Sequence, residues 1–222
     1  MNSKNRTKAA LILNLAVIVL EVTGACLSYM RNGIALFRFY TEDSNFLMMA
    51  ACIVSAIYLI REIRTGSAVP HSVRVFKYTA MSCLAMTFIV VIFVLAPFMT
   101  AAGMNGYQIM MLSGSMLYMH FICPVVSFLS YMLFESGKAL EKGMIKWALL
   151  PTIIYAAIAY TVNIAKLGEG PYPFFYVYRQ PVYASILWLV LLIAVAYILA
   201  RVILRFSRHS EKSGARTRRK EA

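Results

Sequence analysis

The chain from residue 38 to residue 60 reads RFYTEDSNFLMMAACIVSAIYLI, a short polar stretch that leads directly into a long apolar run. An apolar run of about 20 residues is long enough to cross a bilayer as an α-helix. Polar and ionisable side chains are costly in hydrocarbon, so those at the entrance of such a helix should face protein or water. The segment therefore predicts a membrane-spanning helix that begins with a candidate functional group.

Apolar runs of similar length recur along the whole chain, which is 61% hydrophobic. Only helices and closed barrels span lipid, and these runs do not alternate as barrel strands do. The sequence predicts an all-α, polytopic membrane bundle of six transmembrane helices over residues 1–206, followed by a basic cytoplasmic tail at 207–222. The expected spans are Ala9 to Tyr29, Phe39 to Ile60, Val75 to Met99, Ile109 to Phe134, Trp147 to Ala165 and Val182 to Phe206.

The net charge of +13 is distributed unevenly over the segments between these runs. Of the 22 Lys and Arg residues, 18 lie in stretches that share a side with the two termini. Short basic connections stay in the cytoplasm, so both termini are expected to be cytoplasmic and residues 103–107 to lie outside. The charge thus reflects membrane topology, and no nucleic-acid partner is expected.

Polar residues in the first expected span lie at intervals of seven: Asn14, Glu21 and Ser28. This spacing places them on one face of a helix, which should look into the bundle. Glu21 is interpreted either as a structural polar clamp or as a catalytic acid. Because these polar residues interrupt the apolar run, we expect a retained span and not a cleaved signal peptide.

The cysteines indicate no metal or disulfide chemistry. All of them fall inside expected spans, and no pair has CxxC spacing. Small buried packing residues are the simpler interpretation. No metal site and no cofactor are therefore expected.

Thr41 has two interpretations at the entrance of the second span. It is either the N-cap of that helix, with Glu42 and Asp43 in the first turn near the positive end of the helix dipole, or a nucleophile. A Thr hydroxyl is a poor nucleophile at neutral pH and needs a base within hydrogen-bond reach. The choice therefore depends on whether the chain supplies such a base.

His120 is the histidine expected within the membrane, and it lies four residues before Pro124. Proline has no amide hydrogen, so the carbonyl of His120 loses its usual helical partner and the helix should distort there. A distortion beside a histidine in a lipid-embedded span favours an interior cavity. His120 is thus the candidate general base.

Thr41 at the entrance of the second span and His120 in the fourth span together predict a catalytic site. Free backbone amides in the first turn of the second span, with Ser44 or Asn45 as a side-chain donor, are expected to bind a tetrahedral oxyanion. Asp43 or Glu42 is expected to orient the imidazole of His120. At about 1.5 Å per residue, however, the expected bounds place Thr41 roughly 9 Å nearer the outer surface than His120. Either the second span begins earlier, near Ile34, or the fourth begins later.

The connection before the last span, residues 168–178, combines Gly and Pro with many aromatic residues. Aromatic residues gather at the level of the lipid headgroups. We interpret this segment as an interfacial belt, with a lid over the site as the alternative.

Three segments resemble the androgen-induced-gene family of six-span integral-membrane fatty-acid-ester hydrolases, in particular its bacterial branch. They are FYTEDSN at residues 39–45, MHFICP at 119–124 and GPYPFF at 170–175. The resemblance implies a Thr nucleophile at Thr41 and a His base at His120. It also implies a lipid substrate such as a fatty acid ester of a hydroxy fatty acid, and a place in the bacterial cell membrane. Glu42 and Asp43 depart from the family, which usually has apolar residues there.

The leading hypothesis is an intramembrane threonine hydrolase of lipid esters that forms an acyl-Thr41 intermediate. A variant is acyl transfer to a second lipid, in which Cys123 replaces Thr41 as the nucleophile. The alternative from another class is a small multi-pass transporter, channel or lipid-binding protein in which Glu21, Asp43 and His120 form a polar pathway.

Overall fold

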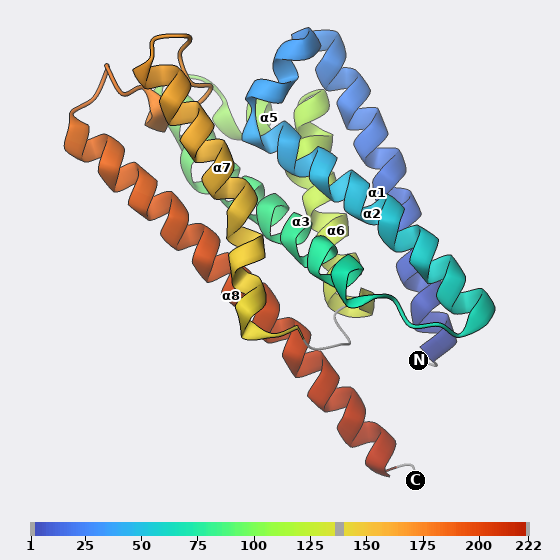
Figure 1. The fold of residues 1–222 in the computed structure, drawn as a ribbon. Coiled ribbons are helices and arrows are strands. Elements are labelled where there is room, and N and C mark those ends of the chain that lie inside the picture. Colours follow the sequence, from blue (N-terminus) through green and yellow to red (C-terminus); the bar gives the residue numbers. More distant parts are fainter. Residues whose placement is uncertain (1–2, 136–139, 221–222) are drawn as a thin grey trace.

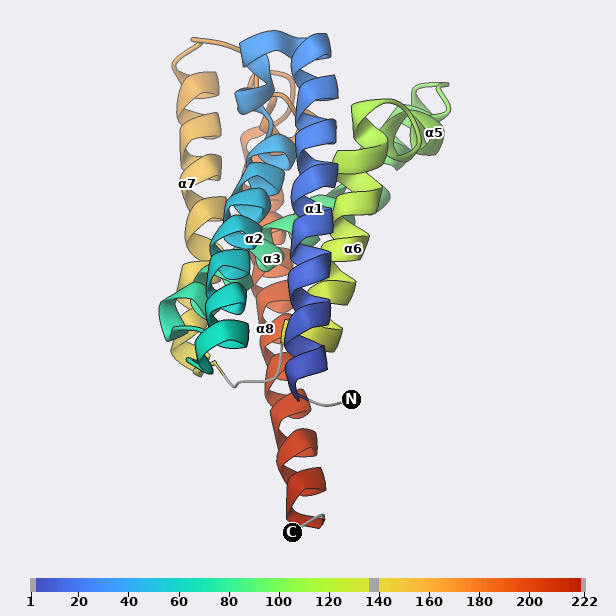
Figure 2. The same ribbon diagram turned by 90° about the vertical axis from the view of Figure 1, so that its right-hand side faces the viewer.

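The structure is a computed structural model that describes residues 3–135 and 140–220, with side chains over residues 4–135 and 140–207. The described residues form helices and turns, without a β-strand among them. Six helical segments are long and apolar enough to cross a membrane, which confirms the expected all-α bundle. Helix α1 begins and helix α8 ends at one end of the bundle, here called the terminal end; the opposite end is the loop end (Figure 2).

The first two spans are α1 (Ser3–Asn32) and α2 (Tyr40–Thr65), joined by the 3-10 helix η1 (Gly33–Arg38). The third span comprises α3 (His71–Val90), the π-helical segment η2 (Val91–Leu95) and α4 (Ala96–Ala101). After the short helix α5 (Gly106–Met111), the fourth span comprises η3 (Leu117–Ile122), α6 (Cys123–Ser130) and η4 (Tyr131–Glu135). The last two spans are η5 (Lys142–Met144) with α7 (Ile145–Ile164), and α8 (Val182–Lys220), with η6 (Pro173–Phe175) between them.

Most expected bounds agree with the structure within a few residues, but the fourth span begins later than predicted. The helix that includes Ile109 is α5, which ends at Met111, and the span itself begins at Leu117. Gly114, with a φ of +54°, turns the chain between them. Glycine adopts this left-handed conformation at little cost. Of the two explanations for the depth mismatch, the later start of the fourth span is therefore correct.

The end of the last helix also differs from the simplest expectation. The apolar part of α8 ends at Ser207, where the basic tail was predicted to begin. The backbone of α8 nevertheless continues as a helix through Lys220. Figure 1 shows this extension projecting beyond the other helices at the terminal end.

Two prolines follow π-helical segments in the same way. Pro97 lies at the start of α4, directly after η2, and Pro124 lies at the start of α6, directly after η3. Proline lacks the amide that would bond the carbonyl four residues earlier, and a wider turn is one way to accommodate the missing bond. The expected distortion at His120 is confirmed, because His120 lies inside η3.

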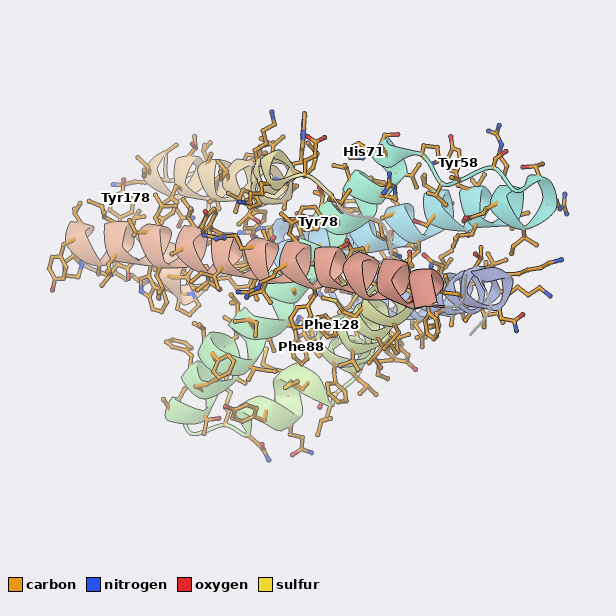
Figure 3. All side chains as sticks on the ribbon, turned by 90° about the horizontal axis from the view of Figure 1, so that it is seen from below. Tyr58, His71, Tyr78, Phe88, Phe128 and Tyr178 are labelled. Carbon is orange, nitrogen blue, oxygen red and sulfur yellow. The ribbon has the colours of Figure 1, made fainter. Side chains whose placement is uncertain are left out.

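Helix α3 occupies the centre of the bundle and contacts α2, α6, α7 and α8 (Figure 1). Tyr78 of α3 is fully buried, and its hydroxyl donates a hydrogen bond to the Ala200 carbonyl of α8 at 2.9 Å (Figure 3). Two buried apolar clusters surround α3. One includes Val17, Met48 and Leu84, and the other includes Val91, Phe174 and Phe175.

Helix α5 packs unusually closely on α4 at Gly106. A Cβ atom at this position would lie 2.0 Å from the Ala96 carbonyl oxygen and 2.6 Å from the Thr100 hydroxyl oxygen. Only glycine permits this approach without a shift of the backbone. The contact fixes the position of α5, which reaches the functional site described next.

Candidate functional site

A cavity of about 230 Å³ lies at the loop end of the bundle. Its walls come from the ends of α1 and α4, the starts of α2 and η3, helix α5 and the loop before α8. The lining residues are Arg31, Asn32, Phe39, Thr41, Glu42, Leu95, Phe98, Met99, Met110, Met116, His120, Pro171, Tyr172, Pro173 and Tyr176. The cavity therefore combines an apolar interior with a few ionisable and hydroxyl groups.

Thr41 lines this cavity as the second residue of α2 and is 6% exposed. The helix is capped at Phe39, without a hydrogen bond from a side chain, so the interpretation of Thr41 as the N-cap is wrong. The Thr41 amide donates to the Tyr172 hydroxyl at 3.1 Å, and that hydroxyl donates to Thr41 Oγ1 at 3.4 Å. This arrangement leaves the hydroxyl proton of Thr41 available to a base.

The first-turn amides do not form the expected oxyanion site. The amides of Glu42 and Asp43 both donate to the Phe39 carbonyl at 3.1 Å, and the Thr41 amide is occupied by Tyr172. Among these groups, the Tyr172 hydroxyl is the donor that lies beside Thr41 Oγ1.

His120 lines the same cavity and is 2% exposed. Its Nδ1 lies 2.7 Å from the Met110 carbonyl oxygen of α5. A carbonyl oxygen can only accept, so Nδ1 must carry the proton in this bond. In the neutral ring the lone pair is then on Nε2, a buried atom without a hydrogen-bond partner among the described residues. His120 is thus held in the tautomer that a general base requires.

Thr41 and His120 lie around one cavity because both occupy the first turn of their spans. They are not hydrogen-bonded to each other, since Nδ1 is bonded to Met110 and Nε2 has no partner in the part of the chain that the structure describes. Catalytic hydrogen bonds are often loose before substrate binds.

The three expected supporting residues do not line the cavity. Ser44 donates to the Thr41 carbonyl at 3.0 Å and shares a hydrogen bond of 2.6 Å with Thr87. Asn45 donates to the Thr41 carbonyl at 2.6 Å and to the Met119 carbonyl at 3.0 Å. Asp43 is half-buried on another side of the first turn. The carbonyl of Met110, and not a carboxylate, orients the imidazole of His120.

The bonds of Asn45 nevertheless connect the two candidate catalytic segments. One amide group bridges the backbone beside Thr41 and the backbone beside His120. A side chain that joins two helices in this way fixes their relative position. Asn45 is therefore placed to hold the site together without entering it.

Glu42 lines the cavity from the next position on α2 and is fully buried. Its Oε1 accepts a hydrogen bond from Ser28 at 2.6 Å, while its Oε2 has no partner among the described residues. Ser28, Glu21 and Asn14 are all buried, which confirms that this face of the first span looks into the bundle.

The residues of the two competing hypotheses, the Cys123 nucleophile and the polar pathway, do not gather around the cavity. Cys123 is buried and does not line the cavity, so the variant with a Cys123 nucleophile has no support from its position. Neither Glu21 nor Asp43 lines the cavity, although His120 does. The three residues of the predicted polar pathway are therefore not brought together around this space.

Tyr172 was not selected from the sequence as a site residue, although it lies in the aromatic loop that supported the family resemblance. Phe174 and Phe175 beside it are buried, and Tyr172 stacks on Phe174 with ring centroids 5.2 Å apart. This part of the loop is a wall of the cavity and resembles the predicted lid more than a belt. Burial raises the pKa of Tyr172 well above its usual range, so its phenol remains a donor at neutral pH.

Comparisons of this chain with models of protein families, with curated proteins and with solved structures give no match.

Proposed function

We propose that this protein is an intramembrane threonine hydrolase of lipid esters. The observation that carries the proposal is the arrangement of Thr41 and His120 around one cavity. Among the described residues, the Thr41 hydroxyl donates no hydrogen bond and Nε2 of His120 has no partner. A hydroxyl and a correctly protonated imidazole are the two groups that nucleophilic ester cleavage needs. The resemblance to fatty-acid-ester hydrolases at residues 39–45 and 119–124 assigns the same two roles.

The chemistry follows from these groups. Thr41 Oγ1 attacks the ester carbonyl carbon while Nε2 of His120 accepts the hydroxyl proton, and a tetrahedral oxyanion forms. The oxyanion collapses, the bond to the alcohol breaks, and His120 returns the proton to the departing alcohol. A water molecule, deprotonated by Nε2, then attacks the acyl-Thr41 ester. The bond to Oγ1 breaks, His120 returns the proton to Oγ1, and the fatty acid and free Thr41 are released.

Other residues of the cavity have supporting roles in this reaction. Tyr172 donates to Thr41 Oγ1 and would stabilise the negative charge that develops on that oxygen as its proton leaves. Leu95, Phe98 and Met99 form an apolar wall suited to an acyl chain. Methionine side chains adapt to irregular apolar ligands.

The proposed substrate is a lipid ester such as a fatty acid ester of a hydroxy fatty acid, which reaches the cavity from the bilayer. The distribution of Lys and Arg supports cytoplasmic termini, so the cavity at the loop end would open toward the outer side of a bacterial cell membrane. Hydrolysis and acyl transfer share the acyl-Thr41 intermediate and differ in whether water or a second lipid accepts the acyl group.

A long-chain fluorophosphonate probe tests the proposal directly. Attack by Thr41 Oγ1 forms an O–P bond and expels fluoride, and the hydroxyl proton goes to His120. We expect mass spectrometry to locate the phosphonyl group on Thr41, with labelling kept in Thr41→Ser and lost in Thr41→Ala. Thr23→Ala is the matched control, because Thr23 does not line the cavity and its hydroxyl donates to the Val19 carbonyl within α1. Undiminished labelling of Thr41→Ala, or no labelling of the parent protein, would overturn the proposal.

A further inference from the structure

A second polar centre lies inside the bundle, near the start of α1 and away from the cavity. Lys77 of α3 is 3% exposed, and its Nζ donates to Asn14 Oδ1 at 2.7 Å and to Cys52 Sγ at 2.8 Å. The same Nζ lies 3.9 Å from Glu135 Oε1, which also accepts hydrogen bonds from Asn14 at 3.0 Å and Ser130 at 2.8 Å. Charges in a membrane span are costly, and those retained there commonly serve ion or proton movement.

Helix α1 connects this centre with the cavity through one face. At the loop end Ser28 is bonded to Glu42, and toward the terminal end Asn14 is bonded to Lys77 and Glu135. Glu21 lies seven residues from both, so it is about 10 Å along the helix from each. It occupies the midpoint between the two polar centres.

Glu21 differs from Glu42 and Glu135 because, among the described residues, neither of its carboxyl oxygens accepts a hydrogen bond. It is 1% exposed. A buried carboxylate without a partner is strongly disfavoured. Glu42 at the cavity likewise has one oxygen, Oε2, without a partner. A buried acid with no geometric hydrogen-bond partner among the described residues is suited to exchange a proton.

The charged and titratable groups around Glu21 come from each helix that packs on this part of α1. Glu42 of α2 and Lys77 of α3 act on its carboxyl group from the two ends, and Cys123 of α6 lies beside it. Cys52 of α2 accepts the hydrogen bond from Lys77 at 2.8 Å. Ionisable side chains are therefore present at the cavity, at the midpoint and at the Lys77 centre.

We propose that protons cross the bundle through Glu42, Glu21 and the Lys77–Glu135 pair, with Glu21 as the site that holds the proton midway. A proton from the cavity converts the Glu42 carboxylate to the acid. It passes through bridging water to the Glu21 carboxylate, which restores Glu42, and then in the same manner to Glu135. Only O–H bonds form and break. This route does not depend on ester hydrolysis and excludes Asp43 and His120 from the path.

Proton flux into vesicles tests the route. The purified full-length protein is placed in phosphatidylcholine vesicles that contain potassium chloride and a pH-sensitive dye, and valinomycin sets an inside-negative potential. We expect the interior to acidify several-fold faster than in protein-free vesicles. Glu21→Gln should reduce the rate to that of protein-free vesicles, whereas Glu21→Asp keeps an exchangeable proton and part of the flux. Glu62→Gln, near the other end of α2, is the matched control and should behave like the parent.

Carbodiimide labelling of the unmodified protein is an independent measurement. Dicyclohexylcarbodiimide enters membranes and reacts with protonated carboxyl groups, so it should modify Glu21, stop the flux, and label less as the pH rises. Parent protein that acidifies vesicles no faster than lipid alone would overturn the proposal, as would an unchanged rate in Glu21→Gln. If Glu21→Gln does not fold, failure of the carbodiimide to modify Glu21 contradicts it instead. Fluorophosphonate labelling of Thr41 is unaffected by either result.

Discussion

The hydroxyl of Tyr172 is bonded to both the backbone and the side chain of Thr41, although 131 residues separate them in the sequence. It accepts from the Thr41 amide at 3.1 Å and donates to Thr41 Oγ1 at 3.4 Å. The loop before α8 thereby sets the position of the candidate nucleophile at the start of α2. The phenol cannot be replaced without loss of both bonds, which makes it a sensitive test of the site.

Tyr172→Phe keeps the ring and its stacking on Phe174 but removes the hydroxyl. We expect ester hydrolysis to fall by about 10- to 100-fold, because a donor beside the reacting oxygen is lost. The decrease should appear in kcat more than in KM, measured with a long-chain ester of 4-methylumbelliferone. Tyr178→Phe, in the exposed part of the same loop, should hydrolyse at the parent rate. A Tyr172→Phe enzyme with unchanged kcat would remove Tyr172 from the site.

His120→Asn separates the basic role of the ring from its structural role. An Asn amide can donate to the Met110 carbonyl as Nδ1 does, but it has no group that replaces the lone pair of Nε2. We expect both His120→Asn and His120→Ala to lose hydrolysis by about 10²- to 10⁴-fold. In detergent, the unfolding temperature of His120→Asn should be closer to that of the parent than the unfolding temperature of His120→Ala is. Substantial turnover by His120→Asn would show that Nε2 is not the base.

Features that depend on local spacing were predictable from the sequence. The inward face of α1 follows from the seven-residue interval between Asn14, Glu21 and Ser28, because helix geometry alone places them together. The distortion at His120 follows from the missing amide of Pro124. The number of spans follows from the length of the apolar runs.

Features that depend on tertiary contacts were not predictable. The turn between α5 and the fourth span has a local signal in Ser113-Gly114-Ser115, because such a Ser/Gly cluster is typical of a turn. The bond between the Met110 carbonyl and His120 has no such signal, since it depends on how α5 folds back against the fourth span. Lys77 lies near the start of its span, where charges normally reach the interface. Its burial depends on Asn14 and Glu135, which are distant in sequence.

Gly106→Ala tests whether the contact of α5 with α4 controls the site. The new Cβ would lie 2.0 Å from the Ala96 carbonyl oxygen, so α5 must move, and with it the Met110 carbonyl bonded to His120. We expect a lower unfolding temperature and a loss of hydrolysis of about tenfold or more, since small misplacement of a catalytic group is costly. Gly143→Ala is the control, because a Cβ there meets no atom within 4 Å. Equal activity of the two variants would show that α5 does not position His120.

Membrane orientation is tested by single cysteines at the two ends of the bundle. In a Cys26→Ser background, Met104→Cys lies in the exposed turn before α5 and Ala68→Cys in the exposed turn before α3. If both termini are cytoplasmic, an impermeant maleimide should label Met104→Cys in intact cells and Ala68→Cys only after permeabilisation. The reverse pattern would place the cavity toward the cytoplasm.

Because the Lys77–Glu135 pair is buried, we expect its two charges to contribute to the unfolding free energy together. Lys77→Met leaves the Glu135 carboxylate with only neutral donors, and removal of one partner of a buried pair costs about 3 kcal/mol. Glu135→Gln in turn leaves a buried ammonium without its counter-charge. The double variant removes both charges, so its loss of unfolding free energy should be smaller than the sum of the two single losses. Denaturation in detergent measures the unfolding free energy of each single variant and of the double variant relative to the parent. Strictly additive losses would mean that Asn14, which bonds to both side chains, holds each of them separately and that the two charges do not act as a pair.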